Sequence, residues 1–387
     1  RGSILTGFPW NLIAYSFLNQ LEIISITSVI GIYGFNLFCI SLFSSPSLLL
    51  LKETNKEIAT FIFFLISLFV FYLYGYHYEK KFYEASKISH DFKVRAVSSN
   101  ISLKRYYSNS NPVPVIEELI KISDPNLEEK TIFIWPEGIL PNISQNDLIK
   151  YKYLFKKKFN KNHFLMIGVN SETKVDDTTN YFNSFALYDN ELNLLNSYNK
   201  INLVPFGEFL PFENFLSNIG LKTVTNNFQS YTKGDRRNII EIKSDNYSLK
   251  ILPLICYEII FSGKIFKKNN FDIIINISED GWFGKSIGPK QHFAHSIFRS
   301  IESGKYIVRS ANNGVSAIIN PIGEIEKSLD LNDNGYVDFK ERKIIQPTVF
   351  SKFGNKIFGL LILLYIFFII SISFVFSFNR TRTGFKN

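Results

Sequence analysis

The stretch ILPLICYEII, at residues 251–260, joins an unbroken apolar run directly to a cysteine, a tyrosine and a glutamate. An apolar run that does not alternate with polar residues is typical of a strand buried on both faces, as in layered α/β domains. Similar runs recur along the chain: FKVRAVSS (92–99), TIFIW (131–135), HFLMIGVN (163–170), NSFALYD (183–189), NIIEIKS (238–244), FDIIINIS (271–278), KYIVRS (305–310) and VSAIINP (315–321). Helical patterns lie between some of them, at 114–122 and 289–303. We therefore predict an α/β domain over residues 91–346 with a layered sheet core.

Long apolar segments flank this domain. The 387 residues are 46% hydrophobic and 16% aromatic, and they include 39 Phe, which is high for a soluble enzyme. Residues 26–51, 58–76 and 357–378 are each long enough to cross the ~30 Å hydrocarbon layer of a membrane. A shorter apolar segment at 4–17 is the candidate remnant of a fourth span. We predict a transmembrane region over 1–85, with two to three spans, and a C-terminal transmembrane helix over 357–378.

Basic residues set an expected orientation for these spans. Those beside the spans lie on one side of them: Lys52, Lys56, Arg380, Arg382 and Lys386. By the positive-inside rule that side is cytoplasmic, so we expect the α/β domain to face outward. The chain begins with Arg1 rather than Met and is apolar from residue 4, so we expect further membrane helices upstream.

The formal net charge of +9 permits nucleic acid or anionic lipid as a partner. The basic residues are scattered and no nucleic-acid motif is present, so we expect lipid headgroups rather than nucleic acid. The densest basic run, KYLFKKKFNKNH at 152–163, is either a solvated helix face or a surface near headgroups. Of the two cysteines, Cys39 lies in an apolar segment, so we predict no disulfide framework.

Three residues in turns or at strand ends could carry chemistry. Glu137 follows TIFIWP, where Pro136 cannot donate a hydrogen bond to a sheet, so it stands at the exit of a strand. Lys200 precedes LVPFGEFLP, whose proline and glycine residues predict a rigid loop that carries Glu208. Cys256 ends the apolar run quoted above. Taken singly, each has a plain structural explanation: a turn carboxylate in water, a surface lysine and a small buried apolar side chain.

In chain order, a strand-end Glu, a Lys and a strand-end Cys resemble the pattern of the carbon–nitrogen hydrolase (nitrilase) superfamily. The match becomes more specific over residues 278–325, SEDGWFGKSIGPKQHFAHSIFRSIESGKYIVRSANNGVSAIINPIGEI, together with LVPFGEFLP and CYE. These motifs, the segment TGFPWNLIAYS (6–16) and the C-terminal apolar segment resemble the apolipoprotein N-acyltransferase family. The resemblance covers nearly the whole chain. It implies membrane α-helices plus α/β, with a nitrilase-like α-β-β-α sandwich domain inserted between transmembrane spans.

The resemblance also implies roles for individual residues. The family's catalytic Glu falls on Glu137, its Lys on Lys200 and its nucleophile on Cys256. The supporting or substrate-binding residues that it implies are Glu208, Tyr257, Glu258 and Trp282.

The chain departs from the family at two places. Glu279 stands where the family usually has Asn. An aromatic loop near the start of the domain usually carries a Trp, where this chain offers Tyr106 or Tyr107. Neither departure touches the three catalytic residues, but the second leaves two candidates, Tyr106 and Tyr107, for the aromatic residue of the substrate-facing loop.

The reaction that the resemblance implies is a two-step, ping-pong acyl transfer. Cys256 takes an acyl chain from the sn-1 position of a membrane phospholipid, which leaves a thioester and a lysophospholipid. The α-amine of a diacylglyceryl-cysteine at an apolipoprotein's N-terminus then attacks the thioester. The implied partners are the phospholipid, the apolipoprotein and the bilayer. The chain would act as a monomer in the bacterial inner membrane, with its catalytic domain on the periplasmic side and no cofactor.

This chemistry needs a base and a cation. A free cysteine has a pKa of about 8.5 and a free glutamate one of about 4.3, so moving the thiol proton to a carboxylate costs roughly 6 kcal/mol. We expect burial to make Glu137 a stronger base and the Lys200 ammonium to lower the pKa of Cys256. Lys200 would also donate to the oxyanion formed when Cys256 attacks a carbonyl. We expect Lys200→Ala to keep the fold and lose activity.

Histidine and metal chemistry have less support in the sequence. None of the five histidines lies beside the cysteine motif, and there is no HExxH or paired-Cys pattern, so we expect no metal site. His292 and His295, three apart on a predicted helix, are expected to pack or hydrogen-bond the loop GWFGKSIGPKQH.

Other functions would use the same residues. A membrane-anchored amidase or nitrilase would pass the acyl group to water, and a catalytically inactive scaffold would retain only the fold. The apolar segment FGEFLPFENFLSNIG (206–220) either gates lipid entry or forms a short amphipathic helix on the domain.

Overall fold

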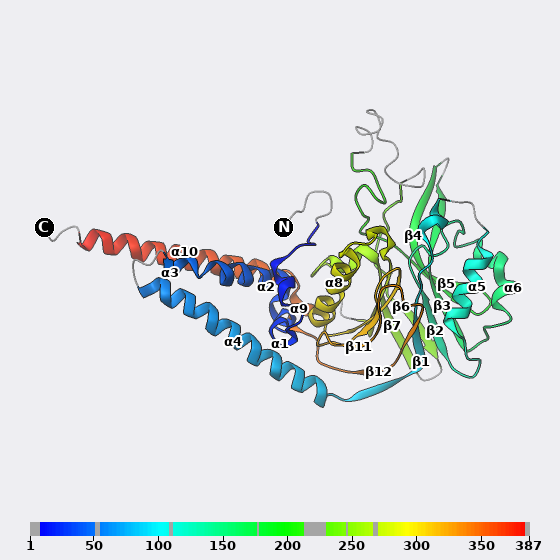
Figure 1. The fold of residues 1–387 in the computed structure, drawn as a ribbon, viewed down its shortest axis with the longest axis horizontal. Helices are drawn as coiled ribbons and strands as arrows, with labels where there is room; N and C mark the ends of the chain where they lie inside the picture. Colours follow the sequence, from blue (N-terminus) through cyan, green and yellow to red (C-terminus); the bar gives the residue numbers. More distant parts are fainter. Residues whose placement is uncertain are drawn as a thin grey trace.

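The computed structural model describes residues 8–50, 55–107, 111–175, 178–212, 230–244, 247–265 and 270–383, with side chains described as far as residue 370. Two six-stranded sheets form the α/β domain, in the strand orders β12-β1-β2-β3-β4-β5 and β11-β10-β9-β8-β7-β6 (Figure 1). The strands of the first sheet are β1 Lys87–Ser98, β2 Thr131–Trp135, β3 His163–Val175, β4 Thr178–Asp189, β5 Leu194–Asn199 and β12 Gly335–Lys343. Those of the second are β6 Ile240–Ser244, β7 Tyr247–Ile255, β8 Ile273–Glu279, β9 Tyr306–Asn312, β10 Ser316–Ile319 and β11 Ile325–Leu329.

Parallel strands occupy the middle of each sheet. β1, β2 and β3 are parallel in the first sheet, as are β7, β8 and β9 in the second, whereas the outer pairs are antiparallel. Every residue of β2, β8 and β9 is buried, as their unbroken apolar runs predict. The strands β5, β11 and β12, which the sequence did not single out, are sheet edges and are largely half-buried or exposed.

The two sheets pack against each other through their inner faces. Ser310, in β9 of the second sheet, donates hydrogen bonds from Oγ to the carbonyl oxygens of Val97 (2.7 Å) and Ile134 (3.1 Å) in the first sheet. Apolar side chains of both sheets share one buried cluster, in which Met166 and Ile275 are fully buried. The domain core therefore lies between the sheets.

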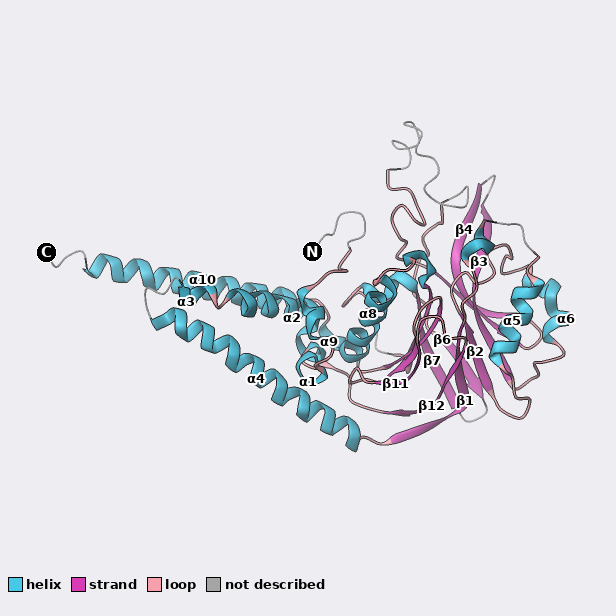
Figure 2. Cartoon of the chain, viewed as in Figure 1, coloured by secondary structure: helices cyan, strands magenta, loops and turns pink. Residues whose placement is uncertain are grey.

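Helices cover the outer faces of both sheets (Figure 2). α5 (Val113–Ser123) packs Ile116 and Leu119 into a buried cluster with the outward side chains of the first sheet. α8 (Gly288–Ser303) covers the outer face of the second sheet, and its Phe298 belongs to the buried cluster that also contains Met166 and Ile275. The order of layers is helix, sheet, sheet, helix, which confirms the predicted α/β sandwich.

Three long helices project together from one side of this sandwich (Figure 1): α2 Thr27–Ser44, α4 Asn55–Glu84 and α10 Lys356–Thr383. Within the described residues, two stretches have the length and hydropathy of a membrane span, Thr27–Leu50 and Asn55–Glu84. The third predicted span lies in α10, but the part of it with described side chains, Lys356–Ile370, is shorter. A membrane region of several spans therefore stays a prediction. The apolar side chains of α4 are mostly exposed, which fits contact with lipid.

The apolar segment at 4–17 has no long helix in its described part. Residues Ile13–Phe17 form the 3₁₀ helix η2, and residues 1–7 lie outside the described chain. η2 is tied to its neighbours by polar contacts, because Tyr15 Oη lies 2.5 Å from His295 Nδ1 and the Ala14 amide donates to Asn36 Oδ1 (3.2 Å). This segment therefore joins the helical region to α8.

The basic run at 152–163 contains the short helix α6 (Lys152–Phe155). It lies on the side of the sandwich opposite α2, α4 and α10 (Figure 1). Lys156, Lys157 and Lys158 are exposed, whereas Phe155 is buried. Of the two explanations that the sequence left open, a solvated face fits this position, and a surface beside the membrane helices does not.

The carboxyl end of α8 holds a break in α2. Gly31 has φ +67°, and a Cβ at this position would lie 2.1 Å from a ring carbon of Phe350. The next amide, of Ile32, donates to Glu302 Oε1 (2.7 Å). Glu302 Oε2 lies 2.8 Å from Arg299 Nε, and both side chains are buried. A charged pair on the α/β domain therefore stabilises a non-helical turn in the first apolar helix.

We expect Glu302→Ala to lower the free energy of unfolding by about 3–5 kcal/mol, because it leaves a buried guanidinium without its carboxylate. It also leaves the Ile32 amide without an acceptor. Thermal unfolding in detergent would measure the change. Glu117→Ala, on the exposed face of α5, is the matched control and should change the stability by no more than about 0.5 kcal/mol. Equal shifts for the two variants would contradict the role of Glu302.

Candidate active site

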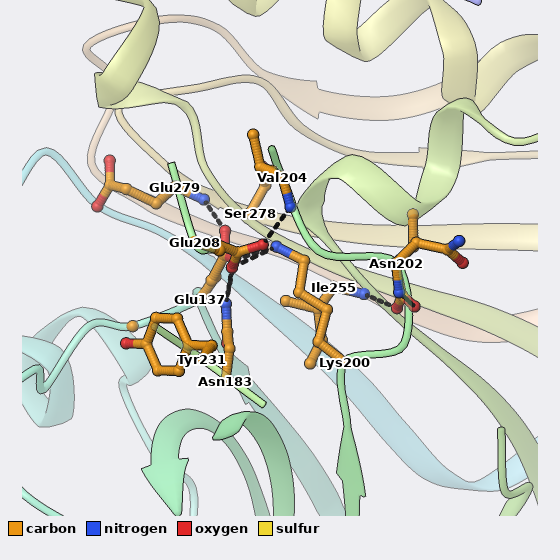
Figure 3. Close-up of polar contacts among 12 residues, drawn as sticks. Glu137, Asn183, Lys200, Asn202, Val204, Glu208, Tyr231, Ile255, Ser278 and Glu279 are labelled. Carbon is orange, nitrogen blue, oxygen red and sulfur yellow. Dashed lines mark hydrogen bonds and ion pairs between the residues drawn. The ribbon is translucent and has the colours of Figure 1, made fainter. Parts of the chain in front are cut away.

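Glu137 stands just beyond the carboxyl end of β2, after Pro136 ends the strand. Its Oε1 accepts hydrogen bonds from Lys200 Nζ (3.0 Å) and Asn183 Nδ2 (2.8 Å), and its Oε2 accepts one from the amide of Glu279 (3.0 Å) (Figure 3). The side chain is 6% exposed. Three hydrogen-bond donors therefore fix the buried Glu137 carboxylate beyond the carboxyl end of β2, in the first sheet.

Lys200 follows β5 and is 1% exposed. Its ammonium lies between two carboxylates, 3.0 Å from Glu137 Oε1 and 2.9 Å from Glu208 Oε1 (Figure 3). Burial acts to lower the pKa of Lys200, but the two carboxylates raise it well above its usual value. The two carboxylates therefore favour the protonated form of Lys200.

Glu208 completes this group from the loop after β5. Its Oε1 also accepts from Asn183 Nδ2 (2.8 Å), and its Oε2 accepts from the amide of Val204 (2.8 Å). Asn183 thus bridges Glu137 and Glu208 from the middle of β4. In the sequence, this asparagine is only a polar residue at the start of an apolar run, so sequence reasoning missed it.

Cys256 lies at the turn between β7 and the 3₁₀ helix η5 (Cys256–Ile260). Its φ of +47° puts a residue with a side chain in the left-handed region, which costs of order 1–3 kcal/mol and is typical of functional sites. The thiol is 9% exposed and lines a cavity of about 310 Å³ together with Glu137, Lys200 and Glu208. The structure therefore brings the three residues of the predicted triad to one cavity, from strand ends of both sheets.

The effect expected of Lys200 on the Cys256 thiol is opposed by a larger effect of burial. Burial raises the pKa of Cys256 well above its usual value, and the negative charges of Glu137 and Asp280 add to the rise. The Lys200 ammonium acts in the predicted direction, but it does not outweigh burial. The resting side chain is therefore a neutral thiol, which needs a base before it can attack.

Glu258 joins the segments that carry Lys200 and Cys256. It is fully buried, and its Oε1 accepts from the amides of Ile201 (3.1 Å) and Asn202 (3.2 Å), while its Oε2 accepts from the amide of Ile255 (3.0 Å). Two of these amides adjoin Lys200 and Cys256 in sequence. Glu258 therefore sets the distance between the cation and the sulfur without lining the cavity itself.

The charge of Glu258 is balanced by Arg237, whose Nη2 lies 2.8 Å from Oε1. Tyr198 Oη donates to the same oxygen (2.6 Å). Burial acts to raise the pKa of Glu258, but the Arg237 guanidinium and these hydrogen bonds lower it below its usual value. The Glu258 carboxyl group is therefore expected to stay ionised.

Aromatic side chains form most of the remaining cavity wall: Phe8, Trp10, Tyr106, Tyr231, Tyr257, Trp282 and Phe283. Tyr257 is 4% exposed and stacks on Phe8 at 6.0 Å between ring centroids. Trp282 is 47% exposed and contacts Tyr106 at 4.9 Å. Of the two tyrosines considered for the substrate-facing loop, Tyr106 lines the cavity, whereas Tyr107 is 63% exposed. The wall is apolar and continues to the surface at Trp282.

His292 and Asp280 form a buried pair beside the cavity, with 2.8 Å between His292 Nδ1 and Asp280 Oδ1. Arg309 Nη2 donates to Asp280 Oδ2 (2.7 Å). Burial acts to raise the pKa of Asp280, but Arg309 and His292 hold it well below its usual value. His292 thus pairs with Asp280, just before the loop 281–292, and its ring contacts Phe283 of that loop at 5.6 Å between ring centroids, which fits the expected packing role.

The start of the apolar segment 206–220 borders the cavity. Gly207 and Glu208 line it, while Phe206 and Phe212 are 45% and 72% exposed. Residues 213–220 lie outside the described chain. The choice between a lipid gate and an amphipathic helix therefore stays a prediction.

Two family models match the chain. Residues 154–343 match the carbon–nitrogen hydrolase model, and residues 1–44 match the apolipoprotein N-acyltransferase N-terminal domain. The first match includes Lys200 and Cys256 but begins after Glu137.

Curated relatives extend the similarity over almost the whole chain. An apolipoprotein N-acyltransferase of Rickettsia prowazekii is 35% identical over 97% of this chain and 74% of its own length. One from Wigglesworthia glossinidia brevipalpis is 34% identical with the same coverage, and one from Rhodopseudomonas palustris is 31% identical over 92% of this chain and 68% of its own. Among solved structures, a nitrilase-superfamily amidase from Nesterenkonia is 11% identical, with a TM-score of 0.43 over 66% of this chain and 92% of its own.

The position of Lys200 changes the outcome expected for Lys200→Ala. Its removal leaves the carboxylates of the buried Glu137 and the half-buried Glu208, each 2.8 Å from the same Asn183 nitrogen, with no cation between them. We expect a loss of about 3–5 kcal/mol in the free energy of unfolding, in addition to the loss of activity. The double variant Lys200→Ala/Glu208→Gln removes one of the two charges and should recover part of that stability. Chemical denaturation would measure both, and equal instability of the two variants would contradict the charge balance.

The raised pKa of Cys256 predicts how the free protein reacts with iodoacetamide. Only the thiolate is alkylated, so the rate should rise about tenfold per pH unit from pH 7 to pH 9 without levelling off. Intact-mass analysis would follow the reaction, with Cys256→Ala to measure any contribution of Cys39. A rate that levels off below pH 8 would show a thiol with a lowered pKa.

Proposed function

The chain belongs to the apolipoprotein N-acyltransferase family, and on that premise we propose how its cavity carries out lipoprotein N-acylation. The protein is an acyltransferase of the carbon–nitrogen hydrolase superfamily. We propose Cys256 as the nucleophile, Glu137 as the base and Lys200 as the cation that stabilises the oxyanion. One observation carries this assignment: an ammonium that stays charged lies 3.0 Å from a buried carboxylate, in the cavity that also holds a strained cysteine.

The first half-reaction forms the thioester. The Glu137 carboxylate accepts the thiol proton of Cys256 as the sulfur attacks the carbonyl carbon of a phospholipid ester at the sn-1 position. Lys200 Nζ and the backbone N–H that follows the nucleophile donate to the oxyanion. The carbon–oxygen bond then breaks, and Glu137 returns the proton to the glycerol oxygen. The products are the acyl-cysteine thioester and a lysophospholipid.

The second half-reaction transfers the acyl chain to nitrogen. The α-amine of a diacylglyceryl-cysteine attacks the thioester carbonyl, and Glu137 accepts a proton from that amine. The oxyanion again lies beside Lys200. The carbon–sulfur bond breaks, the sulfur regains a proton from Glu137, and an amide is released. Because each half-reaction returns Glu137 to its ionised form, one base serves both.

The apolar helices suggest a membrane setting for this reaction. We propose that α2, α4 and α10 lie in the inner membrane and that the sandwich faces the periplasm, with a phospholipid as donor and an apolipoprotein as acceptor. The exposed apolar side chains of α4 and the basic residues beside the spans support this orientation. A monomer would suffice, because every group named in the reaction comes from one chain.

A membrane-anchored hydrolase is the alternative with the same triad. It would pass the acyl group to water instead of an amine. The aromatic wall of the cavity, from Phe8 to Trp282, favours a long acyl chain and a site poor in water. The family of the chain also favours transfer.

Incubation with a phospholipid that carries a labelled acyl chain should give a thioester visible by intact-mass analysis. Cys256→Ala should abolish the adduct, and Glu137→Gln should slow its formation by at least ~10²-fold, since general base catalysis contributes about 10²–10⁴. Addition of a diacylglyceryl peptide should then move the label to the peptide amine. An adduct that persists in Cys256→Ala would exclude this nucleophile. An unmodified peptide beside released fatty acid would point to the hydrolase, and no adduct at all to an inactive scaffold.

A further inference from the structure

A buried ion pair that the reaction above does not use lies at the cavity, with Glu279 in the cavity wall and Arg105 behind it. Arg105, on the 3₁₀ helix η3 (Leu103–Tyr106), is 6% exposed, and Glu279, the last residue of β8, is 1% exposed. Arg105 Nη2 donates to Glu279 Oε2. The two residues are 174 positions apart in the sequence, so only the fold brings them together.

Other contacts hold each partner rigidly. Arg105 Nη1 donates to the carbonyl oxygens of Ile101 and Ser102, both at 3.0 Å. Glu279 Oε2 also accepts from Asn312 Nδ2 at 2.7 Å. A buried ion pair gives little net stability compared with apolar side chains of the same size, because both charges lose their water. The pair therefore calls for an explanation other than stability.

On the arginine side, the pair holds the aromatic loop. The guanidinium carbon of Arg105 lies 4.6 Å from the ring centroid of Tyr106. Tyr106 Oη donates to the carbonyl oxygen of Gly138 (2.7 Å), directly after Glu137, and its ring contacts Trp282 at 4.9 Å. Arg105 thus stands behind the part of the cavity wall that reaches the surface.

On the glutamate side, the pair holds the proposed base. The amide of Glu279 donates to Glu137 Oε2 (3.0 Å), and Figure 3 shows this contact reaching Glu137 from the side opposite Asn183. Glu279 Oε1 also accepts from the amide of Gly281 (2.9 Å), in the turn that carries Trp282. One carboxylate therefore fixes both the strand end that orients the base and the turn that bears the outer wall.

We infer that Arg105 and Glu279 are positioning residues for the acyl donor. Together they orient Glu137 towards the thiol and hold Tyr106 against Trp282, the wall that the phospholipid acyl chain contacts. This inference rests on the proposed function. It also links the two departures from the family pattern, because Glu279 contacts Arg105 in the altered aromatic loop.

The double variant Arg105→Met/Glu279→Gln tests the inference, because it removes both charges and leaves none unpaired. We expect a folded protein in which thioester formation from labelled phospholipid is slowed at least tenfold at saturating donor. The half-saturating phospholipid concentration should rise several-fold. The emission of Trp282, obtained by difference from Trp282→Phe in the same background, should shift to longer wavelength as the wall opens.

Arg95→Met is the control, because the buried Arg95 forms another ion pair, with the half-buried Asp338 (2.7 Å), on β1 and β12. It should lower the melting temperature without changing either kinetic constant. Wild-type kinetic constants in the Arg105→Met/Glu279→Gln double variant would overturn the inference, whereas a wild-type chain that forms no thioester would overturn the proposed function instead. If the double variant does not fold, Arg105→Lys applies the same criteria, since a lysine keeps the charge but cannot contact Ile101, Ser102 and Glu279 at once.

Discussion

The site depends on one buried ammonium held between two carboxylates. A buried lysine normally loses its proton, because the low dielectric disfavours the charge. Glu137 and Glu208 reverse that preference for Lys200, and Asn183 holds both carboxylates in place. Without the Lys200 ammonium, Glu137 and Glu208 would lie close together with no positive charge to balance them. The arrangement therefore places a fixed positive charge, on Lys200, 3.0 Å from the proposed base, Glu137.

The proposed nucleophile, Cys256, is held in a strained turn with a neutral thiol. Cys256 occupies a left-handed turn at a strand end, and burial keeps its thiol protonated. A sulfur that is not ionised at rest reacts little with solvent species, and in the proposed reaction it becomes a nucleophile when Glu137 removes its proton. Glu258 links the turn to the segment after Lys200 through three backbone amides, so the spacing of sulfur and ammonium is set from behind the cavity.

One helix connects this chemistry to the apolar region. α8 contributes His292 beside the cavity and Glu302 at its other end, and the two are separated by about 15 Å at 1.5 Å per residue. Glu302 caps the break in α2 at Gly31, and His295 contacts Tyr15 in the segment before α2. The cavity and the apolar helices are therefore parts of one packed structure. Such a connection suits the proposed reaction, in which both substrates come from a bilayer.

The sequence by itself determined the buried strands and the α/β class, because unbroken apolar runs are local patterns, and its resemblance to a known family proposed the three residues of the triad. It did not reveal the edge strands β5, β11 and β12, whose mixed composition becomes interpretable only beside a neighbouring strand. The tertiary structure alone decided that Asn183 bridges two carboxylates and that Arg105 meets Glu279. It also decided that burial outweighs Lys200 at the thiol, because desolvation depends on the surroundings of a group and not on its neighbours in the chain.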